Sequence, residues 1–548
     1  DEMLLHCLVF VALLSHSHAT PPPRFSAPPI PSKCGGHALW PLPQHCDVRH
    51  SAPVEIVPSR FAFSFASGSP TSDVVEAAFQ RYSKNLFLKF SRKYRESGLE
   101  PPMNEAVREL PHLVVNISEN LNGPKSLEDD ESYRLTIRNT DALLTASNQW
   151  GALYGLESFA QLVKFDAIGH RWLIHNATVD IQDRPRFKWR GLLVDTANHF
   201  LPVSVLERTV RAMATSKLNV LHWHIVDSYS FPLTSQAYPN LTAGAWTPDS
   251  VYSWADVKGV VEYGRLHGVR VVPELDVPGH AWSWGRGYPD VVVDCPDTAR
   301  TDLGHINTVP LDVTKEATYG VVEDVLGEMR QLFPDGFVHV GGDEVIVECW
   351  NASVSVRRWL EDHGMRVGEL QSYFSSRAWP MARRETRRLV IWEEAFPQGR
   401  MHLEDGDIVE VWTDRKLVRN ITSLGYHTLV AVGFYLDRQN PVDGMAGWFW
   451  EDSWRQMYLV DPAAGLSIEQ ENKVVGGEAN MWGEQVDATN YDSRVWPRTC
   501  AVAERLWSRW EGEPDTVEAS GRLATHRCRL VALGIGAGPI WPDSCVVQ

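Results

Sequence analysis

The chain has 548 residues, of which 44% are hydrophobic, and its formal net charge is -17 at pH 7. This length exceeds that of a typical single domain and the apolar content suffices for large cores, so we expect two or three domains. The acidic balance argues against a nucleic-acid partner and is typical of a soluble protein.

The first 19 residues resemble a signal peptide. Their apolar run, Leu4 to Leu14, is too short to span a bilayer, and Ser17-His18-Ala19 resembles a signal-peptidase site. The usual basic segment before the run is missing, because the chain opens with Asp1 and Glu2, so we expect the native precursor to begin upstream. No other stretch is apolar enough for a membrane span.

Cysteines and glycosylation sequons indicate a secretory route. Eight cysteines fit an oxidising compartment, and setting aside Cys7 of the signal-like segment leaves seven, so at least one is unpaired. Sequons occur at Asn116, Asn176, Asn240, Asn351 and Asn420. We therefore expect a protein of the secretory pathway that ends in a vacuole or lysosome or outside the cell.

Residues 20–33 are rich in proline and are expected to form an extended lead. Residues 34–183 mix strand and helix patterns, which predicts a smaller α+β domain that ends near Pro185. Its predicted strands are Val54–Phe65, interrupted at Pro58, and His112–Ile117, Ser132–Ile137 and Arg171–Ile181. Its predicted helices are Val74–Tyr94 and Trp150–Val163.

Residues 184–548 predict a (β/α)8 TIM barrel with a C-terminal tail, because eight short apolar strands alternate with helical patterns. The predicted strands are Trp189–Asp195, Val220–Asp227, Val269–Asp276, Phe337–Glu344, Leu389–Glu394, Asp407–Trp412, His427–Asp437 and Val474–Glu484. The predicted helices include Val205–Lys217, Ala255–His267, Tyr319–Phe333 and Arg357–Arg384. The gap before Asp407 has no room for a full helix, so one crossover is expected to be irregular.

The predicted strand ends, where a TIM barrel places its active site, share a chemical bias. Carboxylates can bind sugar hydroxyls, and flat indoles can cover the apolar face of a pyranose, so several of each favour a sugar site. The residues concerned are Arg190, Asp195, His222, His224, Asp227, Glu274, Asp276, His280, Asp343, Glu344, Trp392, Trp412, Tyr435, Asp437, Trp482 and Glu484.

The most informative motif is Gly341-Gly342-Asp343-Glu344, at the end of the fourth predicted strand. Two glycines allow a sharp turn and a close approach of the ligand. Neighbouring carboxylates raise each other's pKa, and a carboxylic acid with a raised pKa suits a glycosidase that must protonate a leaving oxygen. An isolated Asp-Glu pair is more often simply exposed, so the decision rests on the rest of the chain.

Residues 337–345 resemble the signature of the β-N-acetylhexosaminidases of glycoside hydrolase family 20, in the plant and animal branch. Further blocks resemble family motifs in the right order, at residues 190–195, 222–227, 274–280 and 477–484. The resemblance covers the chain from about residue 184 to the C-terminus and extends more weakly over the preceding domain.

The resemblance implies a role for each matching residue. Glu344 would be the general acid/base, Asp343 would stabilise the substrate's 2-acetamido group, and Tyr435 would bind its oxygen. Arg190, Asp437 and Glu484 would bind hydroxyls of the sugar. Trp392, Trp412 and Trp482 would form the wall of the pocket. Asp227 and His280 would be supporting polar residues.

The resemblance also implies a substrate such as an N-glycan or chitin oligomer and no cofactor or metal. Dimers in the family make a homodimer a further expectation, although no interface is legible in the sequence. Two disulfides, Cys295–Cys349 and Cys528–Cys545, resemble family bridges, whereas Cys34–Cys46 rests on proximity in sequence. Cys500 would be a free, buried thiol.

Adjacent side chains on extended backbone point apart, so Asp343 and Glu344 are not expected to flank one anomeric carbon. The resemblance implies that the substrate itself supplies the second reactant. Its acetamido oxygen would attack the anomeric carbon and form an oxazolinium ion, and the anomeric configuration would be retained. Two alternatives remain. His222 and His224 could bind the metal of a metal-dependent barrel hydrolase, or the aromatic pocket could belong to a non-catalytic sugar-binding protein.

Overall fold

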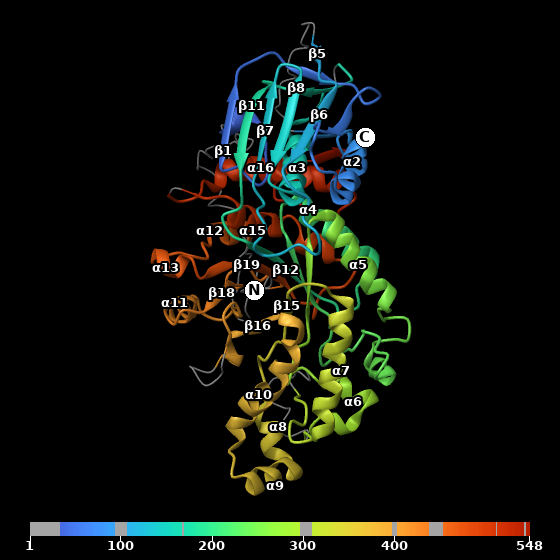
Figure 1. The fold of residues 1–548 in the computed structure, drawn as a ribbon, viewed down its shortest axis with the longest axis vertical. Coiled ribbons are helices and arrows are strands. Elements are labelled where there is room, and N and C mark those ends of the chain that lie inside the picture. The colour runs from blue at the N-terminus through green and yellow to red at the C-terminus, as the bar shows by residue number, and fades with distance from the viewer. Residues whose placement is uncertain are drawn as a thin grey trace, which may run out of the picture.

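The computed structural model describes residues 33–93, 107–166, 169–295, 309–396, 403–437, 453–510, 512–541 and 544–547. The expected signal peptide and nearly all of the proline-rich lead lie outside these ranges. Figure 1 shows an N-terminal sheet domain at one end of the molecule and a barrel with its helices at the other.

Eight parallel strands close into a barrel, and each pairs with the next in chain order. The ring closes between the first and last strands, where Trp189 lies opposite Gly476. This arrangement confirms the predicted TIM barrel. The strands are β12 (Trp189–Asp195), β13 (Val220–His224), β14 (Arg270–Glu274), β15 (Phe337–His339), β16 (Arg388–Trp392), β17 (Ile408–Val411), β18 (His427–Val430) and β19 (Val474–Met481).

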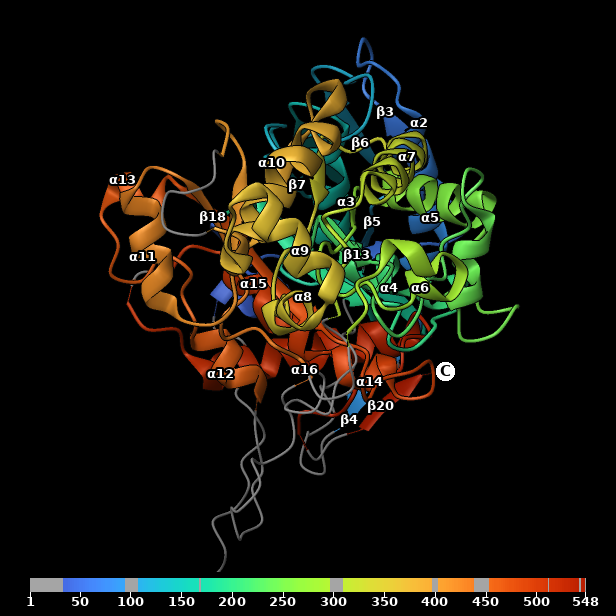
Figure 2. The same ribbon diagram turned by 90° about the horizontal axis from the view of Figure 1, so that it is seen from below.

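Helices surround the barrel and cover the outer face of its strands (Figure 2). The predicted helix Arg357–Arg384 is in fact two helices, because Gly364 adopts a left-handed conformation (φ 61°) and ends the first. The helices are α4 (Val203–Thr215), α5 (Trp254–His267), α6 (Trp284–Gly287), α7 (Glu316–Leu332), α8 (Val347–Ala352), α9 (Val354–His363), α10 (Leu370–Ala382), α11 (Arg415–Ser423), α12 (Ser453–Leu459), α13 (Ile468–Glu471), α14 (Tyr491–Val495) and α15 (Arg498–Trp507).

Several predicted barrel strands are longer than the observed ones. Strands β13, β14 and β15 end at His224, Glu274 and His339, and the polar residues that follow form loops. The irregular crossover is confirmed as far as it is described, because only the short 3-10 turn Glu393–Ala395 follows β16 before residue 396.

The N-terminal domain has a six-stranded sheet and a four-stranded sheet, with helices α2 (Asp73–Asn85) and α3 (Gln149–Leu162). The predicted strand Val54–Phe65 is two strands in different sheets, β2 (Val54–Ile56) and β3 (Ala62–Phe65). The other strands are β1 (His45–Arg49), β5 (Arg108–Glu109), β6 (His112–Ile117), β7 (Tyr133–Arg138), β8 (Asp141–Ala146), β9 (Lys164–Asp166), β10 (Arg171–Ile174) and β11 (Thr178–Asp183).

Two further predictions for the N-terminal domain were wrong in their boundaries. The predicted strand Arg171–Ile181 divides into β10 and β11, which lie in different sheets. The predicted helix Val74–Tyr94 ends at Asn85, and residues Phe90–Lys93 form strand β4 instead. Almost every residue of α3 is buried, because this helix lies between the sheet domain and the rest of the molecule.

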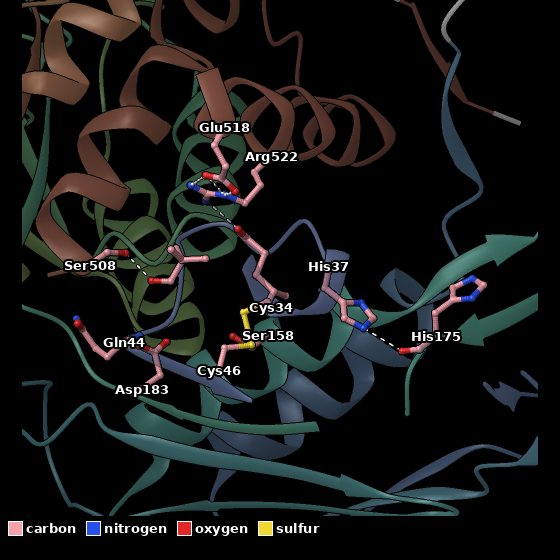
Figure 3. The surroundings of a disulfide bond; sticks show 12 residues. Cys34, His37, Gln44, Cys46, Ser158, His175, Asp183, Ser508, Glu518 and Arg522 are labelled. Carbon is pink, nitrogen blue, oxygen red and sulfur yellow. Dashed lines mark hydrogen bonds and ion pairs between the residues drawn. A yellow bond between two sulfur atoms is a disulfide. The ribbon is translucent and has the colours of Figure 1, made fainter. Parts of the chain in front are cut away.

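The C-terminal segment returns to the N-terminal domain. Helix α16 (Thr516–Ala532) precedes β20 (Ser544–Val547), which pairs antiparallel with β4. Residues 34–46 lie against the same region (Figure 3), where Arg522 of α16 donates to the Leu39 carbonyl. Ser508 donates to the Leu42 carbonyl, so both ends of the described chain are held together.

All three expected disulfides are present: Cys34–Cys46, Cys295–Cys349 and Cys528–Cys545. Cys500 is the free cysteine among the described residues, and it is buried as expected. Within the described chain, no helix combines the length and apolar character needed to cross a membrane.

Candidate active site

A pocket of about 160 Å³ opens at the C-terminal ends of the barrel strands. Ten of the eleven predicted site residues line it, so residues from seven strand ends meet in one place. The pocket also includes Asn198, which the sequence interpretation missed. Its lining is Asn198, Asp227, His280, Asp343, Glu344, Trp392, Trp412, Tyr435, Asp437, Trp482 and Glu484.

The predicted sugar-binding role of Arg190 is wrong. Arg190 is the second residue of β12, so roughly 16 Å of strand separates it from Asp195 at the pocket end. Its side chain is fully buried and forms a bidentate ion pair with Glu131 of the N-terminal domain, at 2.7 and 3.0 Å. Its Nε also donates to the Lys217 carbonyl. Arg190 therefore joins the two domains at the opposite end of the barrel.

A tight turn brings Asp343 and Glu344 into the same pocket. Gly341, Gly342 and Glu344 all have positive φ, at 60°, 97° and 46°. A Cβ on Gly341 would lie 1.7 Å from Asp276 Oδ1, which explains the need for glycine there. The backbone at Glu344 is therefore left-handed, and the extended backbone assumed from the sequence is absent.

The pKa of Asp343 is raised, but its main causes are not the repulsion by the neighbouring Glu344 that the sequence predicted. Burial, followed by the Asp276 carboxylate, raises the pKa of Asp343 well above its usual range. Asp343 is 7% exposed, whereas the side chain of Glu344 is 48% exposed at the pocket mouth. One carboxyl is thus desolvated while its neighbour faces the space that a leaving group would occupy.

His280 connects Asp343 and Glu344 to the barrel interior. Its Nε2 lies 3.8 Å from Glu344 Oε2 and 3.9 Å from Asp343 Oδ2, and its Nδ1 lies 3.2 Å from Asp227 Oδ1. Burial opposes the charged form, but the carboxylates of Asp276 and Asp227 outweigh it and raise the pKa of His280. A positively charged imidazole therefore lies between Asp227 and the catalytic carboxyls.

The chain of buried charges continues beneath the pocket. His224 bonds Asp227 through Nε2 (3.0 Å) and Glu274 through Nδ1 (2.5 Å). Glu274 also accepts a hydrogen bond from Trp392 Nε1 at 2.8 Å, which fixes that indole as part of the pocket wall. The wall residue Trp412 is held in turn by Glu394.

His222 and His224, the residues of the metal alternative, form ion pairs with carboxylates. His222 lies between Glu478 (2.6 Å) and Glu274 (3.1 Å). Burial lowers the pKa of His222, but these two carboxylates outweigh it and raise the pKa to about 10. Groups such as His222, Glu274 and His339 are close enough to share a metal ion. The carboxylates are already ion-paired with these histidines, so ion pairing accounts for the cluster, and a metal ion would have to displace the imidazole proton.

Asn198 and Glu484 form the part of the pocket next to β12. Asp195 accepts from Asn198 Nδ2 (2.6 Å) and from the Gly483 amide (2.8 Å), so it positions this wall. Asn198 Oδ1 is buried and has no partner in the described chain. Burial, followed by the Asp195 carboxylate, raises the pKa of Glu484 to about 7. This wall offers hydrogen-bonding groups to a sugar and contains no cation among its described residues.

Buried carboxyls also predict how stability depends on pH. Burial, then the Glu478 carboxylate, raises the pKa of Glu410 from 4.5 to about 7. The folded protein then binds a proton more tightly than the unfolded chain, so its free energy of unfolding should fall between about pH 5 and pH 8. The full effect of this group is about 3 kcal/mol. The thermal midpoint checks this, and Glu410→Gln should show a weaker dependence than wild type.

An eight-stranded barrel with a carboxylate- and tryptophan-lined pocket at its C-terminal end defines a class of sugar-cleaving barrel enzymes. The chain belongs to glycosyl hydrolase family 20, because residues 187–510 match the family model described as "Glycosyl hydrolase family 20, catalytic domain". Residues 39–162 match a second model, described as "beta-acetyl hexosaminidase like".

Relatives and solved structures agree with this family. β-Hexosaminidase subunit A1 of Dictyostelium discoideum is 36% identical, over 87% of this chain and 86% of its own. β-Hexosaminidase subunit beta of Homo sapiens is also 36% identical, over 99% of this chain and 95% of its own. The X-ray structure of Flavobacterium johnsoniae chitobiase superposes with a TM-score of 0.75 at 29% identity, covering 91% of this chain and 73% of that one.

Proposed function

We propose that this chain is an exo-acting β-N-acetylhexosaminidase that removes terminal, non-reducing β-linked N-acetylglucosamine or N-acetylgalactosamine from glycans. The observation that carries the proposal is the convergence of Asp343, Glu344 and three tryptophans on one small pocket. A cavity of about 160 Å³ has room for one sugar ring and not for a chain, which favours action at a glycan end.

In the proposed mechanism Glu344 protonates the glycosidic oxygen while the substrate's acetamido oxygen attacks the anomeric carbon. Asp343 holds the amide N–H and stabilises the positive charge of the oxazolinium ion, and Tyr435 binds the acetamido oxygen. Glu344 then removes a proton from the incoming water, and configuration is retained. Trp392, Trp412 and Trp482 would exclude water, while His280, held by Asp227, would orient the two carboxyls.

The remaining polar residues would select the sugar. Asp437 and Glu484 lie in the pocket and would bind hydroxyls of the terminal ring, in the role first expected for Arg190. Asn198 would add a hydrogen-bond acceptor beside them. N-glycans and chitin oligomers are the natural substrates that this proposal favours.

Hydrolysis of nitrophenyl β-N-acetylglucosaminide and β-N-acetylgalactosaminide tests the proposal, followed by a panel of defined N-glycans and chitin oligomers. We expect single sugars to be released from non-reducing ends. Binding without hydrolysis would support the non-catalytic alternative. A strong chelator should leave the rate unchanged, and loss of activity that is restored by added metal would instead support the metal-dependent alternative.

We also propose a lysosomal, vacuolar or extracellular location, because three disulfides are typical of oxidising compartments. Asn240, Asn351 and Asn420 are exposed, whereas Asn116 and Asn176 are partly buried. We therefore expect glycans on the first three when the protein is made through a secretory pathway. Enzymatic deglycosylation followed by peptide mass mapping checks this, and three unmodified exposed sites would contradict it.

The proposal includes a homodimer, because the relatives from Dictyostelium discoideum and Homo sapiens are named as subunits. Light scattering coupled to size-exclusion chromatography measures the mass in solution. A single species of about 62 kDa would contradict the dimer, given the chain mass of 61.8 kDa.

A further inference from the structure

A second cavity, of about 290 Å³, lies between the N-terminal domain, the barrel helices and α16. Ala214 and Thr215 at the end of α4 and His267 at the end of α5 line one side. Barrel helices run antiparallel to their strands, so these helix ends lie beside the N-terminal ends of the strands. The cavity is therefore at the opposite end of the barrel from the catalytic pocket. Figure 1 shows α2, α3, α4 and α16 around this junction.

Positive charge dominates the described lining of this cavity. Arg81 comes from α2, Arg211 from α4 and Arg529 from α16, and Lys164 adds a fourth cation. Glu157 of α3 is the one carboxylate among the described lining residues. It already accepts hydrogen bonds from Tyr82 (2.7 Å) and Gln161 (2.8 Å). The cavity therefore has a deficit of negative charge, although the chain as a whole is strongly acidic.

Two of the guanidinium groups have no carboxylate within ion-pair distance, and Glu157 acts on Arg81 only at longer range. Neither Arg81 nor Arg211 forms an ion pair with any residue that the structure describes, and the buried Arg211 Nε has no hydrogen-bond acceptor there. Burial lowers the pKa of Arg81, and it lowers that of Arg529 to about 10. Arg81 and Arg211 are partly buried, and cations withdrawn from water are usually paired, because desolvation without a counter-charge is costly. A bound anion would supply the missing acceptors.

Apolar side chains form the rest of the wall. Leu86, Val163, Phe165 and Trp172 all line the cavity. Inorganic phosphate or sulfate would satisfy the arginines but would leave this apolar surface in contact with water. An anionic group joined to a compact apolar body would satisfy both, and a volume of about 290 Å³ is close to the lower end for small-molecule sites.

We propose that this cavity is a binding site for a small organic acid, whose carboxylate pairs with Arg81 and Arg211 and whose apolar body packs on Phe165 and Trp172. The site joins α2, α4 and α16, so an occupant would also link the N-terminal domain to the barrel. The nearest chemical probe is a medium-chain carboxylate such as octanoate. This inference is independent of the proposed glycosidase chemistry.

Calorimetric titration of the purified full-length chain tests the site with four probes. Octanoate has both a carboxylate and an apolar chain. Acetate has only the carboxylate, octan-1-ol has only the apolar chain, and octylamine has the apolar chain with the opposite charge. We expect octanoate to bind and each of the others to bind at least tenfold more weakly. Octanoate should also raise the thermal midpoint, because a ligand specific for the folded state stabilises it.

Two variants assign the binding to this cavity. Arg211→Gln and Arg81→Gln should each weaken octanoate binding by tenfold or more and leave glycosidase turnover unchanged. Arg366→Gln is the matched control, because Arg366 is exposed and pairs with Glu369 on the surface; it should bind octanoate like wild type.

Three results would overturn the proposal. The first is equal affinity for octanoate and octan-1-ol, which would show a purely apolar site. The second is no octanoate binding by the wild-type chain. The third is unchanged octanoate affinity in both arginine variants, provided that circular dichroism and turnover show them folded. If a variant does not fold, the four-probe comparison on wild type still decides.

Discussion

Glu344→Gln should lower turnover of an alkyl-linked N-acetylglucosaminide by about 10²–10⁴-fold and leave substrate binding largely intact, because the amide cannot donate the proton. Glu344 is positioned for this role, since a left-handed turn directs it into the pocket mouth, 3.8 Å from His280. A substrate with a very acidic leaving group should be spared in part, because that oxygen departs without protonation. Steady-state rates for a series of leaving groups measure both effects.

Glu348→Gln is a suitable control for this variant. Glu348 lies four residues further along the chain, in α8, and does not line the pocket. It should retain the wild-type rate on every substrate. A Glu344→Gln enzyme that still cleaves the alkyl-linked substrate at full rate would remove Glu344 from the role of proton donor.

The barrel could be predicted because its strands are short, largely apolar runs between helical patterns. Strands β12, β13 and β14 are buried along their whole lengths, so their sequences contain little to confuse them with helices. The N-terminal sheets were harder to predict. Strand β8 alternates buried and exposed residues and was missed. Pro58 predicted an interruption of Val54–Phe65, but not that the two parts join different sheets.

Those site residues that directly follow an apolar strand could be predicted from the sequence. A motif match does not show which end of a strand a residue occupies, and this is why Arg190 was assigned to the wrong end of β12. Asn198 was missed because it lies three residues beyond the strand, in a loop whose path is set by hydrogen bonds to Asp195. The left-handed backbone at Glu344 could not be predicted either, because residues other than glycine rarely adopt it.

Asp343→Asn should lower turnover of N-acetylated substrates by about 10²–10³-fold, because it removes the negative charge opposite the oxazolinium ion. Burial and Asp276 raise the pKa of Asp343, so its carboxylate is poorly stabilised by the protein alone. A cationic intermediate with an amide N–H supplies the missing partners. Asp343 therefore interacts more strongly with the intermediate than with water, which is the condition for lowering the barrier. Rates and thiazoline inhibition constants for both enzymes measure the loss.

The identity of the nucleophile can be decided by changing the substrate. If the acetamido group attacks, a 2-hydroxy glucoside should react orders of magnitude more slowly than its 2-acetamido counterpart in the wild-type enzyme. Asp343→Asn should reduce the rate difference between the two substrates, because Asp343 acts only through the acetamido group. The competing possibility is an enzyme nucleophile, and Glu484 and Asp227 are carboxylates that line the pocket. A fluorosugar that becomes covalently attached to either residue, located by peptide mass, would refute the substrate-assisted mechanism. Unmodified protein together with a slow 2-hydroxy substrate would assign the attack to the acetamido oxygen.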